Sequence, residues 1–451
     1  MRRGNLRETE RALTSLQTGT RQVSVSIANL DAPIHHGICT HSMETTIDRQ
    51  LDSHLFNLLV SPLGQDALAQ IVALDPTPAE SLSVSKKLRK GFPPEIVAAA
   101  LTLHDLRRHA CSKFDRTAEM YFTREGLEQS TSERIAVWRA KRYAGMKVVA
   151  DLCCGIGGDL IALAQLPGLE RLIAADLDPD HLAMAIANAH IHASELAIDG
   201  RWEDVRTVDL TGIDGLFIDP ARRNEHGRTL DGGSEPPLDW VFGLDARVPA
   251  IGVKTAPGIP HDVMPDGWEL ETVAIGHDLK EAALWSPVLA TAWRRATIVT
   301  EHGVETMSSD RSESLQPRPE PIEPVIGMWL HDPNPAVTRA GLVQQLANDI
   351  GGSQIDEQIA FLLTSDRAPS PFTRSLPIIA SAPWNEKHLR QLLRDLDAGA
   401  MDIRRRGLAG DVDAIGKRLR QKGSRPVMLA MTRHLDKPWA IICDDVPAER
   451  S

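Results

Sequence analysis

An acid followed by closely spaced glycines is the first feature of this 451-residue chain whose residue types could do chemistry. In the stretch VVADLCCGIGGDL an apolar run ends in Asp151, and Gly155 and Gly157 follow. Glycines allow the backbone to turn tightly after a strand and to approach a ligand where the next helix begins. About 20 residues further on, the run RLIAAD ends in Asp176, whose carboxylate could accept hydrogen bonds from ribose hydroxyls. This spacing predicts a site for a cofactor that contains a nucleoside.

Two classes of cofactor are compatible with such a turn. A dinucleotide fingerprint requires a third glycine where the chain has Leu160, and it does not require an acid four residues before the first glycine. Asp151 and the missing glycine therefore favour S-adenosylmethionine. Cys153 lies within the turn, where we expect it to fill space beside the cofactor. A nucleophilic cysteine that methylates pyrimidine carbons is the less favoured alternative, because such a residue would lie beyond the fourth strand.

The methyl acceptor is expected beside a different strand end. The run GLFIDPARR ends in Asp219, Pro220, Arg222 and Arg223, and ligands of such sheets bind at the carboxyl ends of the strands. The Asp219 carboxylate and the Pro220 carbonyl could accept N–H bonds from an amine and orient its lone pair for attack. The two arginines could stack on a base or hold phosphate, or could be surface ion-pair partners. Lys254, in IGVKTAPGIPH, follows the next strand and is a further candidate for binding the substrate.

The hydrophobic pattern predicts the elements that position these residues. Apolar runs KVVADL, RLIAAD, DGLFID, AIGVKT, ETVAI and RATIVT alternate with helical or loop stretches, which is typical of a doubly wound α/β sheet. We expect this central domain over residues 146–305. Apolar positions recur at helical spacing over residues 46–145 and predict a helical N-terminal domain. Residues 1–45 are polar with little periodicity and predict a flexible extension.

Basic residues gather in the C-terminal region. The Pro-rich segment 306–325 predicts a linker, and residues 326–451 end in a small α/β module at about 376–445. Within residues 404–425 the basic residues outnumber the acids. The candidates for binding RNA phosphate are Arg404, Arg405, Arg406, Lys417 and Arg420. A chain with a formal net charge of -11 would need such a local patch to bind RNA, although the same residues could form only a solvated helix face.

The motif DLCCGIGGD followed by AADLDP resembles the cofactor-binding motifs of class I S-adenosylmethionine-dependent methyltransferases. This resemblance implies a Rossmann-like, seven-stranded sheet. It also implies that Asp151, Gly155 and Gly157 lie by the methionine moiety and that Asp176 binds the ribose. Asp204, in RWEDV, takes the place of the acid that follows the third strand and lies beside the adenine amine.

Two further resemblances concern the substrate. The segment KFDRTAEMYFTREGLEQSTSERIA is similar to the approach segment of trimethylguanosine synthases, which methylate a guanine exocyclic nitrogen on RNA caps. This resemblance implies that the stretch from Gln129 to Thr131 lies over the cofactor. Their acceptor motif is Ser-Pro-Pro-Trp, from which DPARR departs. From about residue 50 to 445 the chain is more similar to bacterial class I methyltransferases with a C-terminal THUMP-like domain, through FIDPARR, KTAPGIPHD, DIRRRG and GKRLRQKG. THUMP domains bind RNA, so this resemblance implies an RNA-directed activity.

Composition narrows the cellular setting. No run approaches the roughly 20 apolar residues of a bilayer-spanning helix, and the N-terminal MRRGNLRETERALTSL lacks the apolar core of a secretory signal. Five scattered cysteines fit neither a disulfide framework nor paired zinc knuckles. We therefore expect a cytoplasmic protein with neither a membrane nor a metal partner.

These features together predict a methyltransferase that uses S-adenosylmethionine to modify a base nitrogen in structured RNA, with guanine as a candidate base. A small-molecule methyltransferase is the first alternative. A catalytically silent RNA-binding protein that keeps the cofactor fold is the second. The target nucleotide, the RNA species and the oligomeric state are open at this point.

Overall fold

The computed structural model describes residues 22–23, 55–222, 234–311 and 320–445. The chain divides into two compact units. The first comprises Met1–Ala221 with Glu235–Ile251, and the second comprises Arg222–Ser234 with Gly252–Ser451. Almost all of the predicted extension over residues 1–45 lies outside the described residues.

Helices make up the N-terminal part of the first unit, as the apolar periodicity predicts. They are α2 (Leu55–Val60), α3 (Pro62–Leu74), α4 (Ser81–Leu88), α5 (Pro94–Ala110), α6 (Arg124–Gln129) and α7 (Glu133–Ala140), followed by the 3-10 turn η1 (Lys141–Tyr143). Local sequence sets where they begin: the Ser61 hydroxyl accepts the Gly64 N–H at the start of α3, and α3 and α5 both open on a proline. Within the described residues, no helix is long and apolar enough to cross a membrane.

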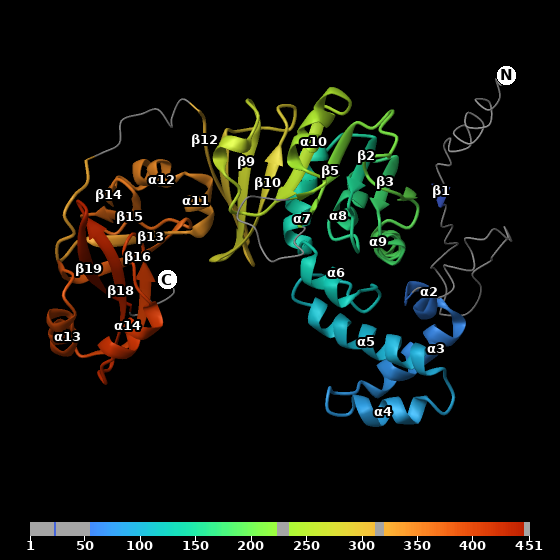
Figure 1. Ribbon diagram of the computed structural model, residues 1–451, viewed down its shortest axis with the longest axis horizontal. Helices are drawn as coiled ribbons and strands as arrows, with labels where there is room; N and C mark the ends of the chain where they lie inside the picture. Colours follow the sequence, from blue (N-terminus) through green and yellow to red (C-terminus); the bar gives the residue numbers. More distant parts are fainter. Residues whose placement is uncertain (1–21, 24–54, 223–233, 312–319, 446–451) are drawn as a thin grey trace, which may run out of the picture. The chain divides into compact units, whose positions relative to one another are not determined.

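Parallel strands form the centre of the first unit. They are β2 (Val148–Leu152), β3 (Arg171–Asp176), β4 (Ala197–Trp202) and β5 (Gly215–Ile218), and β2 pairs in parallel with both β3 and β5. The strand order is β1 (Gln22–Val23), β4, β3, β2, β5 and then β8 (Ala250–Thr255), whose first two residues belong to this unit. Figure 1 shows α8 (Leu160–Ala164) and α9 (Pro179–His192) beside β2 and β3. The carboxyl ends of β2, β3, β4 and β5 therefore lie along one edge.

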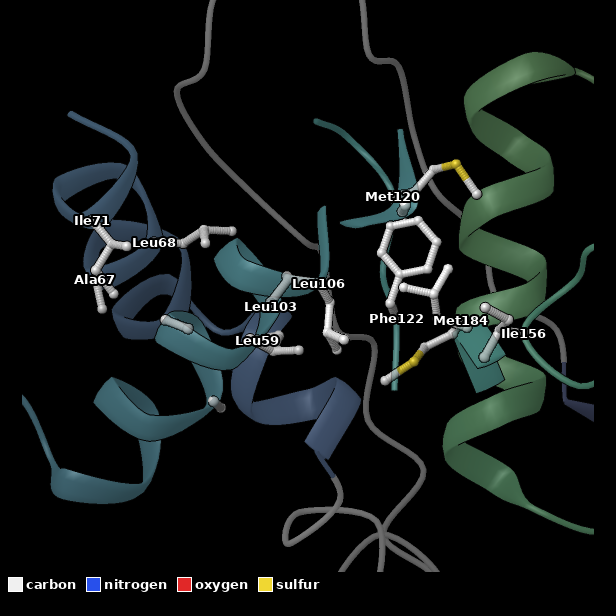
Figure 2. Close-up of a cluster of buried hydrophobic side chains, with 14 of the residues drawn as sticks. Leu59, Ala67, Leu68, Ile71, Leu103, Leu106, Met120, Phe122, Ile156 and Met184 are labelled. Atoms are coloured by element: carbon white, nitrogen blue, oxygen red, sulfur yellow. The ribbon is translucent and has the colours of Figure 1, made fainter. Parts of the chain in front are cut away.

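One hydrophobic core contains residues of the N-terminal helices together with residues of the glycine turn, α8 and α9. Leu59 and Leu103 of α2 and α5 belong to the same buried cluster as Phe122, Ile156 and Met184. Figure 2 shows Phe122 beside Ile156 of the glycine turn and Met184 of α9. The helical segment thus packs directly on the turn that the sequence predicts to hold a cofactor.

Buried polar contacts reinforce this packing. The fully buried Asn188 of α9 accepts the Tyr121 N–H at 2.8 Å and donates to the carbonyls of Tyr121 at 2.9 Å and Ile156 at 3.0 Å. The Asp180 carboxylate accepts the backbone N–H groups that open α2, at 3.0 Å each. These side chains satisfy main-chain groups that burial would otherwise leave unpaired.

Most of the described strands of the second unit belong to two sheets. In the first, the order is β8, β10 (Asp278–Trp285), β9 (Glu269–Ile275), β11 (Arg294–Thr300) and β12 (Gly303–Ser309), and β9 and β11 are parallel. In the second, the order is β14 (Ser353–Asp356), β15 (Ile359–Thr364), β13 (Trp329–Pro333), β16 (Thr373–Pro383), β19 (Lys437–Asp444), β18 (Arg425–His434) and β17 (Ala398–Arg405). The helices are α11 (Pro335–Ala340), α12 (Val343–Ile350), α13 (Glu386–Asp395) and α14 (Val412–Leu419). The predicted mixed α/β fold is confirmed, and β12 extends beyond residue 306, where the linker was predicted to start.

We expect Asn188→Ala to destabilise the first unit by about 2 to 4 kcal/mol, because it leaves buried main-chain groups without partners. The measurement is urea unfolding followed by a probe within that unit. Gln165→Ala is the matched control, since the exposed Gln165 amide bonds a carbonyl of the adjacent helix, that of Ile161, at 3.1 Å. Equal losses of stability in the two variants would contradict a special role for Asn188.

Candidate functional site

The two glycines of the turn have different tasks. Both adopt positive φ, +52° at Gly155 and +90° at Gly157, which residues with a side chain rarely adopt. A Cβ at Gly157 would lie 2.9 Å from the Cα of Ala185, so this glycine permits close packing on α9. A Cβ at Gly155 would meet no atom within 4 Å. Gly155 therefore leaves space open directly after β2, as a ligand-binding turn requires.

Asp151 lies at the base of this turn and is almost completely buried. Its Oδ2 atom has no hydrogen-bond partner among the described residues. Burial raises the pKa of Asp151 well above its ordinary value, and the nearby carboxylates of Asp159 and Asp219 raise it further, while Arg139 opposes them. A buried acceptor without a donor is costly, so this oxygen is suited to a cationic N–H donor such as the ammonium of an amino acid.

Arg139 supplies positive charge beside the turn. It comes from α7, is buried, and forms an ion pair with Asp159, the residue that precedes α8. Its guanidinium also lies over the Phe217 ring of β5, 4.6 Å from the ring centroid. Arg139 bonds Asp159, whereas the Oδ2 atom of Asp151 has no hydrogen-bond partner among the described residues. The sequence analysis missed Arg139, because an arginine on a helix carries no local signal of its tertiary partner.

Asp176 is oriented by the turn itself. Its Oδ2 accepts the Gly155 N–H at 2.8 Å, and its Oδ1 accepts the Asp178 N–H at 2.9 Å. Burial raises the pKa of Asp176, whereas these two hydrogen bonds oppose the rise. A carboxylate oxygen can accept more than one hydrogen bond, so this fixed carboxylate keeps the capacity to bind a pair of ribose hydroxyls.

Asp204 follows β4, the strand that the sequence marks only weakly. Its carboxylate receives a bidentate pair of bonds from Arg206, with Nε at 3.0 Å and Nη2 at 2.7 Å from its oxygens. Arg206 also forms an ion pair with Glu235 at 2.8 Å. Because β3 and β4 are parallel, Asp204 lies at the same strand edge as Asp151 and Asp176. The contacts with Arg206 hold its carboxylate in place.

The segment that ends in Thr131 lies against the glycine turn. Thr131 is buried, and a Cβ on Gly158 would lie 3.1 Å from the Thr131 carbonyl oxygen. Lys113 holds this segment: its ammonium donates to the carbonyls of Leu127 at 2.6 Å, Glu128 at 3.0 Å and Ser130 at 3.0 Å. A cation at these carbonyls complements the end of α6. Lys113 is a second positioning residue that the sequence analysis missed.

The thiols of the turn are poor nucleophiles. Burial and the surrounding carboxylates raise the pKa of Cys153 and that of Cys154. The thiolate, which is the reactive form, is therefore disfavoured at neutral pH. This supports the interpretation of Cys153 as a residue that fills space in the turn.

The predicted acceptor residues begin at the end of β5. The Asp219 N–H donates to the Leu152 carbonyl at 3.1 Å, which places Asp219 beside the end of β2, and Pro220 is buried. Arg222 ends the described segment as part of β6 (Ala221–Arg222), and Arg223 lies outside the described residues. Lys254 lies on β8 in the second unit, opposite Ala283 of β10.

The predicted RNA-binding residues differ in how much of their charge is engaged. Arg404 pairs with Asp402 at 3.1 Å, and Arg405 donates to the Gly410 carbonyl at 2.9 Å. Arg406 pairs with Asp332 at 2.7 Å and lies over the Phe361 ring. Lys417 on α14 and Arg420 at its end are exposed. The charge of Arg406 is therefore engaged within the fold, whereas Lys417 and Arg420 face solvent.

We expect Asp176→Ala to weaken binding of S-adenosylhomocysteine by about 10- to 100-fold, because a hydrogen bond to a charged group contributes about 1.5 to 3 kcal/mol. Isothermal titration calorimetry is the measurement. Glu170→Ala is the control, since this exposed acid precedes β3 and pairs with Lys147. Unchanged affinity in Asp176→Ala would remove Asp176 from the cofactor site.

Family models match three parts of the chain. Residues 146–217 match the RNA cap guanine-N2 methyltransferase model, and residues 373–445 match the THUMP domain-like model. Residues 52–110 match a domain of unknown function. The first match contains β2, β3 and β4 with the acids Asp151, Asp176 and Asp204, and it ends before Asp219.

Individual proteins are similar over a larger part of the chain. A putative methyltransferase from Porphyromonas gingivalis W83 has the same fold, with a TM-score of 0.65 and 18% identity over 82% of this chain and 99% of that one. An uncharacterized S-adenosylmethionine-dependent methyltransferase of Mycobacterium tuberculosis, found in strains CDC 1551 and H37Rv, is 37% identical over 347 residues, which are 73% of this chain and 90% of the relative. The buried acceptor of Asp151, the open turn at Gly155 and the oriented carboxylate of Asp176 fit the cofactor that this relative's name specifies. The chain belongs to the S-adenosylmethionine-dependent methyltransferases.

Proposed function

We propose that this methyltransferase modifies a base nitrogen in structured RNA, with guanine as a candidate base. The observation that carries the proposal is the position of Asp219: its N–H donates to the Leu152 carbonyl, so Asp219 and Pro220, which can accept N–H bonds from an amine, follow β5 beside the end of β2. The RNA cap guanine-N2 methyltransferase match covers residues 146–217, ends two residues before Asp219, and supports RNA as the substrate.

The residues at the strand edge would each bind a different part of the cofactor. Asp151 would hold the ammonium of the cofactor, Asp176 its ribose, and Asp204 the adenine amine, while Thr131 covers the turn. When bound, S-adenosylmethionine supplies an electrophilic methyl group on a sulfonium. Glycine and carboxylate contacts of this kind fix the donor without taking part in the transfer.

The acceptor residues would align the substrate. The Asp219 carboxylate and the Pro220 carbonyl accept N–H bonds from the amine, which turns its lone pair toward the methyl group. An amine that gains a methyl group must lose a proton, and Asp219 or solvent would accept it. Positioning is therefore the main contribution of the protein. Arg222 and Arg223 would hold the base or its phosphate, and Lys254 would add a further contact.

RNA capture is assigned to the C-terminal region. The THUMP domain-like match over residues 373–445 contains Arg404, Arg405, Lys417 and Arg420, which give a chain of net charge -11 a local basic surface. A cytoplasmic location belongs to the same proposal. It is supported by the four described cysteines, none of which forms a disulfide.

Transfer of a labelled methyl group from S-adenosylmethionine to total RNA tests the proposed reaction. We expect label in an N-methylated nucleoside, identified by mass spectrometry, and a loss of about 100-fold or more in kcat in Asp219→Ala with cofactor affinity changed less than a few fold. Asp209→Ala is the control, an exposed acid that precedes β5 and accepts bonds from Thr211. Label only in small molecules would favour the small-molecule alternative, and cofactor binding without any transfer would favour the silent RNA-binding protein.

Reversal of Arg404, Arg405, Lys417 and Arg420 to Glu tests the RNA surface. We expect RNA affinity to fall, and the log–log slope of affinity against salt to decrease by roughly 0.7 to 0.9 for each RNA phosphate that the variant no longer neutralises. A matched control reverses the charge of the same number of exposed basic residues on and just after α4, namely Lys86, Lys87, Arg89 and Lys90. If filter binding shows the same loss of RNA affinity in both variants, the C-terminal residues are only a solvated surface and not an RNA-binding site.

A further inference from the structure

A cavity of about 350 Å³ lies in the second unit, and none of its lining residues is one of those assigned to the cofactor. Its lining comes from the segments 261–268 and 292–294 together with Arg311. Its volume is at the lower end of the range of about 300 to 1,000 Å³ that is typical of ligand pockets. The cavity is therefore large enough for one small ligand or one unit of a polymer.

Strand register places this cavity at a defined edge of the first sheet of this unit. Its lining precedes Glu269, where β9 begins, and includes the first residue of β11. Glu269 lies opposite Trp285 of β10, which in turn lies opposite Gly252 near the start of β8. The cavity is thus at the edge where β8 begins, whereas the predicted substrate-binding Lys254 is near the end of that strand.

Arg294 gives the cavity its chemical character. The residue is 4% exposed, its Nε has no hydrogen-bond partner, and no carboxylate among the described residues forms an ion pair with it. Burial lowers the pKa of Arg294. By contrast, the charge of the next residue, Arg295, is compensated by an ion pair at 2.8 Å with the buried Glu269. A buried guanidinium without an anion is costly, so Arg294 marks a place for an anionic ligand.

The guanidinium is also preorganised. Its central carbon lies 4.6 Å from the centroid of the Trp293 ring, and its Nη1 contacts the Met264 sulfur at 3.9 Å. These contacts restrict the rotamers of the side chain. A guanidinium can donate a bidentate pair of hydrogen bonds to a phosphate, so Arg294 suits an anion with several acceptor oxygens.

The remaining walls combine aromatic and basic groups. The buried Trp268 and the partly exposed Trp293 offer ring surface. His261 is fixed by a 2.9 Å contact between its Nε2 and the Arg339 carbonyl. Arg311 pairs with Asp266, the one carboxylate in the lining among the described residues, but both side chains are largely exposed, so this pair is weak and can exchange for a ligand. A phosphate beside an aromatic wall is the chemistry of a nucleotide.

We propose that this cavity binds one nucleotide unit of the RNA substrate, with its phosphate on the Arg294 guanidinium and its base against the tryptophan wall. The inference rests on the proposed RNA substrate and adds a contact beyond the methyl-transfer site. Because its lining contains none of the residues assigned to methyl transfer, the cavity would hold a nucleotide other than the one that is methylated.

Calorimetry on the full chain tests the cavity directly. The protein is saturated with S-adenosylhomocysteine, so that the cofactor site cannot take up the probe, and is titrated with guanosine monophosphate, with guanosine and with a short single-stranded RNA. We expect the monophosphate to bind at least 10-fold more tightly than the nucleoside, and Arg294→Gln to weaken the monophosphate and the RNA at least 10-fold. The short RNA should compete with the monophosphate.

Two further variants complete the design. Lys280→Gln removes an exposed cation of β10 that pairs with Asp278, and should leave nucleotide affinity unchanged. Arg294→Lys keeps the charge without the planar fork, and should restore only part of the affinity. Arg294→Gln should keep or raise the melting temperature of the free protein, since it removes an unpaired buried charge.

Clear outcomes would overturn the proposal. Equal binding of nucleotide and nucleoside, or unchanged nucleotide affinity in Arg294→Gln, would remove the cavity as a phosphate site. An RNA that fails to compete with the monophosphate would overturn the assignment to an RNA unit. The methyl-transfer assay is read separately, so loss of transfer with intact Arg294-dependent binding would count against the proposed reaction rather than against the cavity.

Discussion

The burial of the Asp151 carboxylate at the end of β2 is the constraint on which the rest of the first unit depends. Its Oδ2 has no donor among the described residues, and the buried cation beside it, Arg139, is bonded to Asp159. A buried polar group without a partner is costly, so packing elsewhere in the fold must offset this cost, and a ligand that supplies a donor removes it on binding. The helices before β2 provide that packing, because Phe122 and Leu103 belong to the core that contains Ile156 of the turn.

The same arrangement links stability to the cofactor. Because the fold raises the pKa of Asp151, the free protein loses stability as the pH rises from the ordinary pKa of an aspartate toward the raised value, where the buried group ionises. A cofactor ammonium beside Asp151 would favour the ionised form and reverse this loss. Asn188 holds Ile156 of the turn, and Lys113 holds the segment that ends in Thr131 and lies against the turn, so binding should stabilise the helical segment and the strands together.

The strands and their terminal acids could be predicted from the sequence, because apolar runs end in acids such as Asp151 and Asp176, and parallel strands bring such ends to one edge. Positions that depend on tertiary contacts could not. Arg139 and Lys113 lie on or beside helices with no local sign of their partners. Charge counting has the same limit: Arg406 belongs to a basic run, yet it pairs with an acid far away in the sequence. The missing anion of the buried arginine at the start of β11 likewise becomes visible only in three dimensions.

Proton release on cofactor binding tests the central claim most directly. Calorimetric titrations with S-adenosylhomocysteine in buffers of different ionisation enthalpy, at mildly acidic pH, count the protons exchanged. If the cofactor ammonium pairs with Asp151, binding lowers the raised pKa of this group, so the parent protein releases protons and its affinity falls as the pH decreases through that pKa. Asp151→Asn should bind more weakly and release fewer protons. Identical proton release and affinity in the two proteins would contradict the assignment of Asp151 to the cofactor.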